Sequence, residues 1–412
     1  MKHLNRWVYA VVGVVTLFFA GVIYAWSVLS TPIAAAFPEW GKAQLSLTFT
    51  ITMIFFCLGC MTGGMLAGKV SPKIYVWAAA AMLWVGFWMT AQSQTLPMLY
   101  IGFGVISGFG SGLTYNAVMA TITRWFPDQQ GMVSGILLMG FGLSAFVIGK
   151  LYQTLTPAGI DGWRSSFRFM GAVTAIVLAV CAFFFEVPGD DFAPPAAAKA
   201  KKVRTAGKES STAQMLRSPA FWMYYLWAVL LSAAGLALIS QATGSASEVG
   251  SQVSAGTIAT VVGLISVANA VGRVLSGILF DKCGRSITMQ IVNAVFIITG
   301  AVLSLALVSG NFALIVLGFV LGGLAYGGVT PTNSAFVSSY FGQKHYAMNF
   351  SVINTNLIFA SFGSTIAGAL YDASGSYLST YLLMAGLAVA GILLSLGIGL
   401  CDRNNAKNLG NQ

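Results

Sequence analysis

Charged side chains are scarce in this sequence. Only 8% of its 412 residues are Asp, Glu, Lys or Arg, whereas soluble globular proteins carry roughly 25%. Acidic residues number eleven and histidines two, His3 and His345. A mean hydropathy of +0.80 leaves too little polar surface to cover a particle in water. The composition therefore excludes a soluble protein. It also lacks the cluster of titratable or metal-binding side chains that a membrane enzyme needs, so we expect neither an enzyme nor a bound cofactor or metal.

Long apolar runs fill the chain instead. About 20 apolar residues cross the bilayer core as a helix, and the alternating ten-residue pattern of barrel strands is absent. The first run follows Lys2 and Arg6 like a signal peptide, but its length and the later runs favour a retained helix. The sequence thus predicts an all-α polytopic membrane protein with twelve transmembrane spans, near 7–37, 44–68, 73–92, 98–122, 131–155, 165–186, 219–245, 255–280, 286–308, 311–334, 346–371 and 376–400.

Basic residues are distributed unevenly about these spans. If the N-terminus is cytoplasmic, sixteen of the 21 Lys and Arg residues lie on that side, Arg273 lies within a span, and four lie outside, namely Lys42, Lys150, Arg164 and Arg168. This is the positive-inside pattern. The net charge of +10 therefore indicates topology rather than a nucleic-acid partner. We expect a bacterial-type inner (plasma) membrane protein with both termini in the cytoplasm.

The chain repeats itself around a polar linker. Residues 189–218 are rich in Pro, Ala, Lys and Ser, which predicts a cytoplasmic linker between a six-helix half at 1–188 and a second at 219–412. The segment Gly64-Met-Leu-Ala-Gly-Lys69 returns 213 residues later as Gly277-Ile-Leu-Phe-Asp-Lys282. Parallel six-span repeats are a transporter architecture, with the substrate site at the midplane between the halves. No phosphate-binding loop of the Walker type occurs, so we expect transport that ATP does not drive.

One stretch at the end of span 8 resembles a known signature. Gly277-x-Leu-x-Asp281-Lys282-x-Gly-Arg285 resembles the signature loop of the major facilitator superfamily, which implies that fold and a role for Asp281, Lys282 and Arg285 in gating the cytoplasmic side. The first-half copy departs from this pattern, because Gly68 stands where the Asp would be and Ser71 where the Gly would be.

A narrower resemblance involves four further motifs. The motifs are Tyr24-Ala-Trp-Ser27, Arg124-Trp-Phe-Pro127, Arg217-Ser-Pro-Ala-Phe-Trp222 and Thr332-Asn-Ser334. In these motifs the chain is similar to the oxalate/formate antiporter group and to bacterial monocarboxylate transporters, which are themselves similar to the proton-linked monocarboxylate (L-lactate) solute carriers. These solute carriers also have a single arginine in span 8.

The most informative residue is Arg273. It lies in the apolar run 261–280, and a charge at the bilayer centre costs at least roughly 2.5–3.5 kcal/mol. Asp281 follows two turns later, about 12 Å along the helix, which is a long way for the side chain to reach the surface. All eleven acidic residues fall in loops or at span ends on this map. A structural arginine bonded to a neighbouring helix is the alternative, but we favour a substrate carboxylate, which the planar guanidinium binds bidentately.

The number of buried cations limits the number of anionic groups that the substrate can carry. One midplane cation matches one anionic group. The resemblance to the oxalate-transporting relative places a lysine of span 11 at the position of Asn356, so a dicarboxylate would keep one charge uncompensated here. We therefore expect a small monocarboxylate such as lactate, pyruvate or formate, with oxalate or another short dicarboxylate as the alternative. A drug antiporter or a sugar transporter would need intramembrane acids or many amides, which are sparse.

Further side chains are candidates for lining the site. Asn269 lies one helical turn before Arg273 and shares its face, while plain interhelical hydrogen bonds or packing remain the alternative for every candidate. Tyr326 matches a tyrosine of the antiporter's site by resemblance. The remaining candidates are Tyr24, Leu29, Tyr115, Asn116, Asn356 and Phe359.

The coupling mechanism is the least determined expectation. Similar mammalian transporters carry an Asp four residues before the arginine, which is taken as the proton acceptor, and Asn269 stands there instead. We expect proton-coupled symport by alternating access, with the proton carried by the substrate or a water, and a monomeric protein. Anion exchange of the oxalate/formate type needs no proton carrier and is the alternative.

Overall fold

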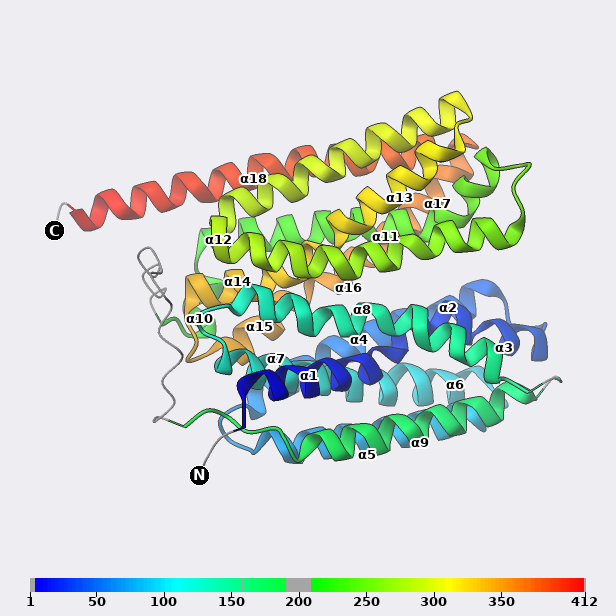
Figure 1. Cartoon of the computed structure of the whole chain (residues 1–412), viewed down its shortest axis with the longest axis horizontal. Helices are drawn as coiled ribbons and strands as arrows, with labels where there is room; N and C mark the ends of the chain where they lie inside the picture. The colour runs from blue at the N-terminus through cyan, green and yellow to red at the C-terminus, as the bar shows by residue number, and fades with distance from the viewer. Residues whose placement is uncertain (1–3, 158, 160, 190–208, 411–412) are drawn as a thin grey trace. The chain divides into compact units, whose positions relative to one another are not determined.

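The computed structural model describes residues 4–157, 159, 161–189 and 209–410, and in this part of the chain the structure is almost entirely helical (Figure 1). The first half of the chain contains α1 (Arg6–Ala20), η1 (Gly21–Ala25), α2 (Trp26–Leu29), α3 (Thr31–Ala36), α4 (Lys42–Leu66), α5 (Pro72–Ala91), α6 (Leu96–Leu99), η2 (Tyr100–Ser107), α7 (Gly108–Ile122), η3 (Thr123–Trp125), α8 (Gln130–Leu155) and α9 (Gly162–Ala182). The rest contains α10 (Thr212–Leu216), α11 (Pro219–Val249), α12 (Ala255–Ser309), α13 (Phe312–Gly327), α14 (Val329–Phe341), α15 (Tyr346–Asn354), α16 (Asn356–Ala360), α17 (Phe362–Ser374) and α18 (Leu378–Gly410).

Twelve membrane crossings fit these helices. Eleven helical stretches of the described residues are long and apolar enough to span a bilayer, and one of them, α12, has 55 residues. Gly284 breaks α12 with φ 80° and ψ −178°, a backbone conformation that residues with a Cβ rarely adopt. The chain turns back on itself within α12 (Figure 1). Spans 8 and 9 are therefore joined at a single glycine, and the predicted twelve-span all-α fold is confirmed.

Local sequence signals set the helix ends. Pro72 and Pro219 occupy the first turn of α5 and α11, where proline loses no hydrogen bond. The side chain of Ser254 accepts a hydrogen bond from the Thr257 amide at the start of α12. Asn311 does the same for Ala313 at the start of α13.

Several predicted single helices are segmented in the structure. Span 1 runs through α1, the 3₁₀ turn η1, α2 and α3, and span 11 runs through α15, α16 and α17. Span 4 contains the π-helical segment η2, where the Ser107 hydroxyl donates to the Gly102 carbonyl at 3.0 Å. Apolar periodicity does not predict such interruptions, which occur often at functional positions.

The chain divides into two compact units. The first comprises residues 1–205 together with 346–352, and the second comprises 206–345 and 353–412. The start of span 11 packs within the first unit, because Asn116 Nδ2 donates to the Ala347 carbonyl at 2.9 Å and the rings of Tyr115 and Phe350 stack with centroids 5.7 Å apart. Most of the predicted linker, 190–208, lies outside the described residues. Its described end docks in the second unit, where the Ser210 amide donates to the Phe341 carbonyl.

Candidate substrate-binding site

Arg273 is buried in the part of α12 that precedes the break at Gly284. Only 8% of the residue is exposed, and its Nε donates to Asn269 Oδ1 at 2.9 Å. The two side chains therefore share one helix face, as their spacing predicts. The hydrogen bond through Nε holds the guanidinium against Asn269, and a planar guanidinium is a group that binds carboxylates bidentately.

A close crossing of α12 and α13 positions this pair. A Cβ atom added to Gly272 would overlap the backbone of Leu324, and one added to Gly323 would overlap the backbone of Ile265. One added to Gly327 would overlap the backbone at Asn269 and the Arg273 amide. The two helix backbones therefore touch at the turn that carries Arg273, as small residues allow in membranes.

Tyr326 lies at the same crossing, directly before Gly327. Its ring packs against Gly235 of α11, and 7% of the residue is exposed. The structure thus brings Asn269, Arg273 and Tyr326 together in the second unit.

The first unit contains the same crossing between α4 and span 4. Gly59 packs on the backbone of Phe109, Gly108 on that of Thr52, and Gly112 on that of Phe56. These contacts match the α12–α13 contacts one for one, with a shift of 213 residues on one helix and 215 on the other. In this register Cys60 occupies the position of Arg273 and Phe56 that of Asn269.

The candidates of the first unit surround an aromatic cluster. The Tyr115 ring lies 5.2 Å from Phe56 and 5.3 Å from Phe141 between centroids. Tyr24 lies 5.1 Å from Phe141 and 5.9 Å from Phe49. Sequence reasoning missed Phe56 and Phe141. The internal repeat is a signal that would have found Phe56, because that residue aligns with Asn269.

The remaining candidates have different surroundings. Asn116 is fully buried, and its Nδ2 also approaches Cys60 Sγ at 3.7 Å. Leu29 is fully buried, and its carbonyl accepts from the Tyr152 hydroxyl at 3.5 Å. Both residues belong to the first unit, whereas Arg273 belongs to the second, so their place in a site stays a prediction.

Asn356 and Phe359 lie on span 11 in the second unit. Asn356 is fully buried, donates to the Ile353 carbonyl at 2.6 Å and accepts from the Ser232 hydroxyl at 3.4 Å. Phe359 is 57% exposed and meets the Tyr225 ring at 6.4 Å between centroids. Their contacts with substrate likewise stay a prediction.

The predicted gating residues surround the break in α12. Asp281 and Lys282 are exposed, whereas Arg285 is 6% exposed. Arg285 Nη2 lies 2.9 Å from Asp402 Oδ2 and Nε lies 3.2 Å from the Tyr340 hydroxyl, which also donates to Asp402. Arg285 therefore connects the start of span 9 to the ends of spans 10 and 12, through two partners that the sequence did not reveal.

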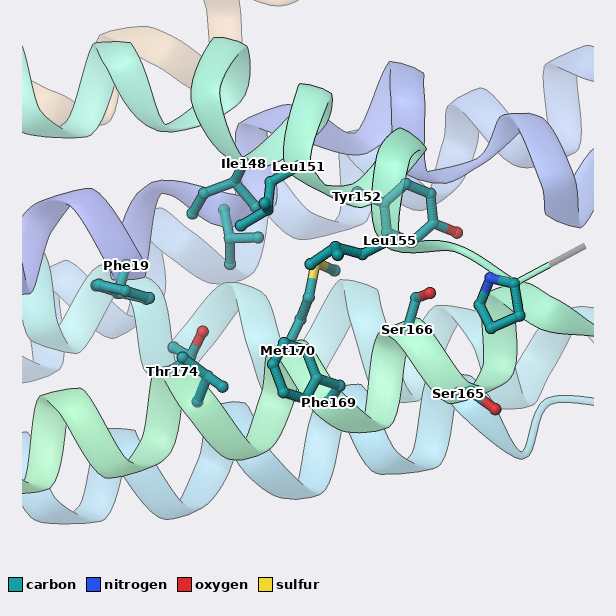
Figure 2. A pocket seen from close by; sticks show the side chains of 13 residues that line it. Phe19, Ile148, Leu151, Tyr152, Leu155, Ser165, Ser166, Phe169, Met170 and Thr174 are labelled. Carbon is teal, nitrogen blue, oxygen red and sulfur yellow. The ribbon is translucent and has the colours of Figure 1, made fainter.

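A cavity of about 190 Å³ lies in the first unit between span 1, α8 and α9 (Figure 2). Apolar side chains such as Leu151, Leu155, Phe169 and Met170 line most of it, and Tyr152, Ser165, Ser166 and Thr174 add hydroxyl groups. Among the described residues, no charged side chain lines this cavity. It therefore offers no countercharge for a carboxylate, and Arg273 remains the better candidate.

Known proteins are similar to this chain in sequence and in fold. The sequence profile described as Major Facilitator Superfamily matches residues 11–355 and again 237–411. The chain belongs to the Major Facilitator Superfamily. The resemblance predicted from residues 277–285 is thereby confirmed, and the protein is a membrane transporter rather than an enzyme.

Two sequence relatives and one solved structure show what the chain is similar to. The oxalate:formate antiporter of Oxalobacter formigenes is 26% identical over 370 residues, which cover 88% of this chain and 85% of that protein. Monocarboxylate transporter 13 of Bos taurus is 23% identical over 384 residues, covering 92% and 86%. The crystal structure of the E. coli fucose:proton symporter FucP superposes with a TM-score of 0.68 at 14% identity, covering 96% and 99%, and supports the fold alone.

Proposed function

We propose that this transporter moves a small monocarboxylate of the lactate or pyruvate type across the membrane, with Arg273 binding the carboxylate. The observation that carries the proposal is the buried Arg273 guanidinium, whose Nε donates to Asn269 Oδ1 at 2.9 Å. Both residues lie at the glycine crossing of α12 and α13. A guanidinium in a site of low dielectric attracts a carboxylate strongly; at about 4 Å and an effective dielectric near 20 the attraction is roughly 4 kcal/mol before desolvation.

Two features support a monocarboxylate rather than a dicarboxylate. The first unit repeats the crossing but carries Cys60 at the position of Arg273, so the anion-binding group is not duplicated. Asn356 also takes the place of a second cation, and its amide bonds to Ile353 and Ser232. Among the relatives, one is named a monocarboxylate transporter and another an oxalate:formate antiporter. Both names support a carboxylate substrate.

The proposed coupling is proton symport by alternating access. Asn269 cannot titrate and accepts a hydrogen bond from Arg273, so the proton would travel with the substrate or with a water. Anion exchange is the second candidate, and the named antiporter among the relatives favours it. In either case we place both termini in the cytoplasm of an inner membrane, in agreement with the distribution of basic residues. We propose that seven further side chains line the substrate path, namely Tyr24, Leu29, Tyr115, Asn116, Tyr326 and the span 11 candidates Asn356 and Phe359.

Uptake of labelled L-lactate into proteoliposomes tests this proposal. Wild type is compared with Arg273→Ala, and Arg168→Ala, the loss of an exposed arginine in α9, serves as the charge-matched control. We expect uptake that follows an inward proton gradient, survives in the control and disappears in Arg273→Ala. Uptake that ignores the gradient but requires an internal anion would assign exchange instead. Normal uptake by Arg273→Ala would reject the carboxylate-binding role.

A further inference from the structure

A cavity of about 350 Å³ opens at the loop between α4 and α5 in the first unit. Its walls come from this loop, from the start of α5 and from the end of span 4. On the proposed topology this is the cytoplasmic end of the unit. The side chains and loop positions that define its chemistry are Gly68, Lys69, Ser71, Tyr75, Thr121 and Arg124.

Two cations face this cavity without an acid beside them. Lys69 is exposed on the loop and Arg124 is half-buried in η3. Among the described residues, neither lies within 4.0 Å of a carboxylate, and no Asp or Glu lines the cavity. Like charges that face a shared space repel each other. A bound anion would remove that repulsion.

The internal repeat shows which residue of the first unit stands at the position of an acid in the second. With the shift of 213 residues, Lys69 corresponds to Lys282 and Gly68 corresponds to Asp281. A Cβ atom added to Gly68 would meet nothing within 4 Å. Gly68, which aligns with Asp281 in sequence, therefore has open space beside it and carries no carboxylate.

We propose that this cavity binds a phosphate-type oxyanion, which takes the place of the missing carboxylate between Lys69 and Arg124. The hydroxyl-bearing side chains of Ser71, Tyr75 and Thr121 on the walls add donors for an anion that has several oxygens. Such an anion would tie the loop after α4 to the end of span 4. The proposal does not depend on the identity of the transported substrate.

A phosphoryl group has two sources at a cytoplasmic membrane surface, free phosphate and the headgroup of an anionic phospholipid. The test uses the full-length protein in nanodiscs of phosphatidylcholine, titrated with inorganic phosphate at constant ionic strength. A ligand that binds only the folded state raises the melting temperature, and above its Kd the rise continues with the logarithm of the ligand concentration. We expect such a rise in wild type, and in Lys69→Gln and Arg124→Gln an apparent affinity that is weaker by roughly tenfold or more, as for loss of a charge-assisted bond. Arg217→Gln, which removes an exposed charge from the second unit, is the control and should leave the affinity unchanged.

Restoring the acid gives a second, independent test. Gly68 has φ 80°, a conformation that Asp and Asn adopt more readily than other residues. Gly68→Asp should abolish the phosphate response, because its carboxylate occupies the cavity. Gly68→Asn carries the same backbone strain without the charge, so it should retain most of the response. Equal loss in both variants would overturn the proposal.

Nanodiscs of phosphatidylglycerol separate the two sources. If the lipid raises the melting temperature through Lys69 and Arg124 and abolishes the phosphate response, the headgroup is the ligand. If the phosphate response persists, the ligand is the free anion. No response to phosphate or to the lipid, or a response that survives both charge substitutions, overturns the proposal.

Discussion

The two units build the same helix crossing and give it different chemistry. In the second unit Gly272, Gly323 and Gly327 bring α12 against α13, and Arg273 projects from that crossing. In the first unit Gly59, Gly108 and Gly112 make the corresponding contacts between α4 and span 4. There, Cys60 occupies the arginine position.

The loops that follow the two crossings also differ in charge. Asp281 in the second unit corresponds to Gly68 in the first. In both places the second unit carries a charged side chain where the first carries a small uncharged residue. The backbone contacts thus define the repeated scaffold, whereas the charges on it differ between the units and define the proposed anion chemistry.

Replacement of Arg273 should have the largest effect. Arg273→Lys keeps the charge but loses the bidentate geometry and the Nε bond to Asn269. We expect the KM for L-lactate to rise roughly 10- to 100-fold, the equivalent of one or two charge-assisted hydrogen bonds. Initial uptake rates over a range of lactate concentrations give this value. Cys60→Ser, at the repeated position, is the matched comparison and should leave the KM within about twofold, as expected for a residue that loses no charged contact.

Replacement of a crossing glycine by alanine should destabilise both units alike but should weaken lactate binding only in the second unit. In Gly327→Ala the new methyl group would overlap the backbone of α12, and in Gly112→Ala it would overlap the backbone of α4. Overpacking of this kind destabilises by roughly 1–3 kcal/mol. Both variants should melt earlier in detergent, whereas Gly386→Ala, where nothing lies within 4 Å of the added atom, should not.

Only Gly327→Ala should also weaken lactate binding, since it displaces the backbone of Arg273 itself. Equal losses of affinity in Gly327→Ala and Gly112→Ala would contradict the assignment of the carboxylate site to the second unit.

Replacement of Asn269 should have a moderate effect on the KM for lactate, because this side chain orients Arg273 without supplying charge. Asn269→Ala removes one hydrogen bond to a charged group, so we expect the KM to rise roughly tenfold with little change in kcat. Asn269→Asp keeps the acceptor and adds a titratable group beside the guanidinium. A kinetic comparison of these two variants at several pH values would show whether an acid at this position strengthens proton coupling. An unchanged KM in Asn269→Ala would limit Asn269 to helix packing.

Addition of a second cation should have the smallest effect on lactate transport but should alter the selectivity between lactate and oxalate. In Asn356→Lys the new charge would lie on span 11 of the second unit, where Asn356 is fully buried. We expect oxalate to compete with lactate several-fold better, in line with the roughly 1–3 kcal/mol that a charge-assisted bond contributes. Competition assays measure this change, and Asn356→Met controls for the loss of the amide. If oxalate competes equally in both variants, the charge-counting argument fails.

Sequence reasoning predicted the fold well because apolar run length is a direct physical requirement of the bilayer. It also predicted that Asn269 and Arg273 share one helix face, since a four-residue spacing on a helix leaves little freedom. The break between spans 8 and 9 was expected, but not that it would consist of Gly284 alone.

Contacts between distant segments could not be predicted in the same way. The partners of Arg285, Tyr340 and Asp402, lie on two other helices, and hydropathy carries no information about which helix ends meet. The π-helical turn at Tyr100–Ser107 arises from backbone geometry that the apolar pattern does not record. Phe141 belongs to the aromatic cluster only because α8 packs beside span 4 and α4.

The most direct test of the account is the binding of L-lactate to purified protein, measured by isothermal titration calorimetry without any gradient. Wild type is compared with Arg273→Gln and with Cys60→Ser, the same position in the other unit. The account predicts that Cys60→Ser binds like wild type and that Arg273→Gln loses roughly tenfold or more in affinity. Equal affinity in all three proteins would show that the charge at this crossing does not hold the substrate.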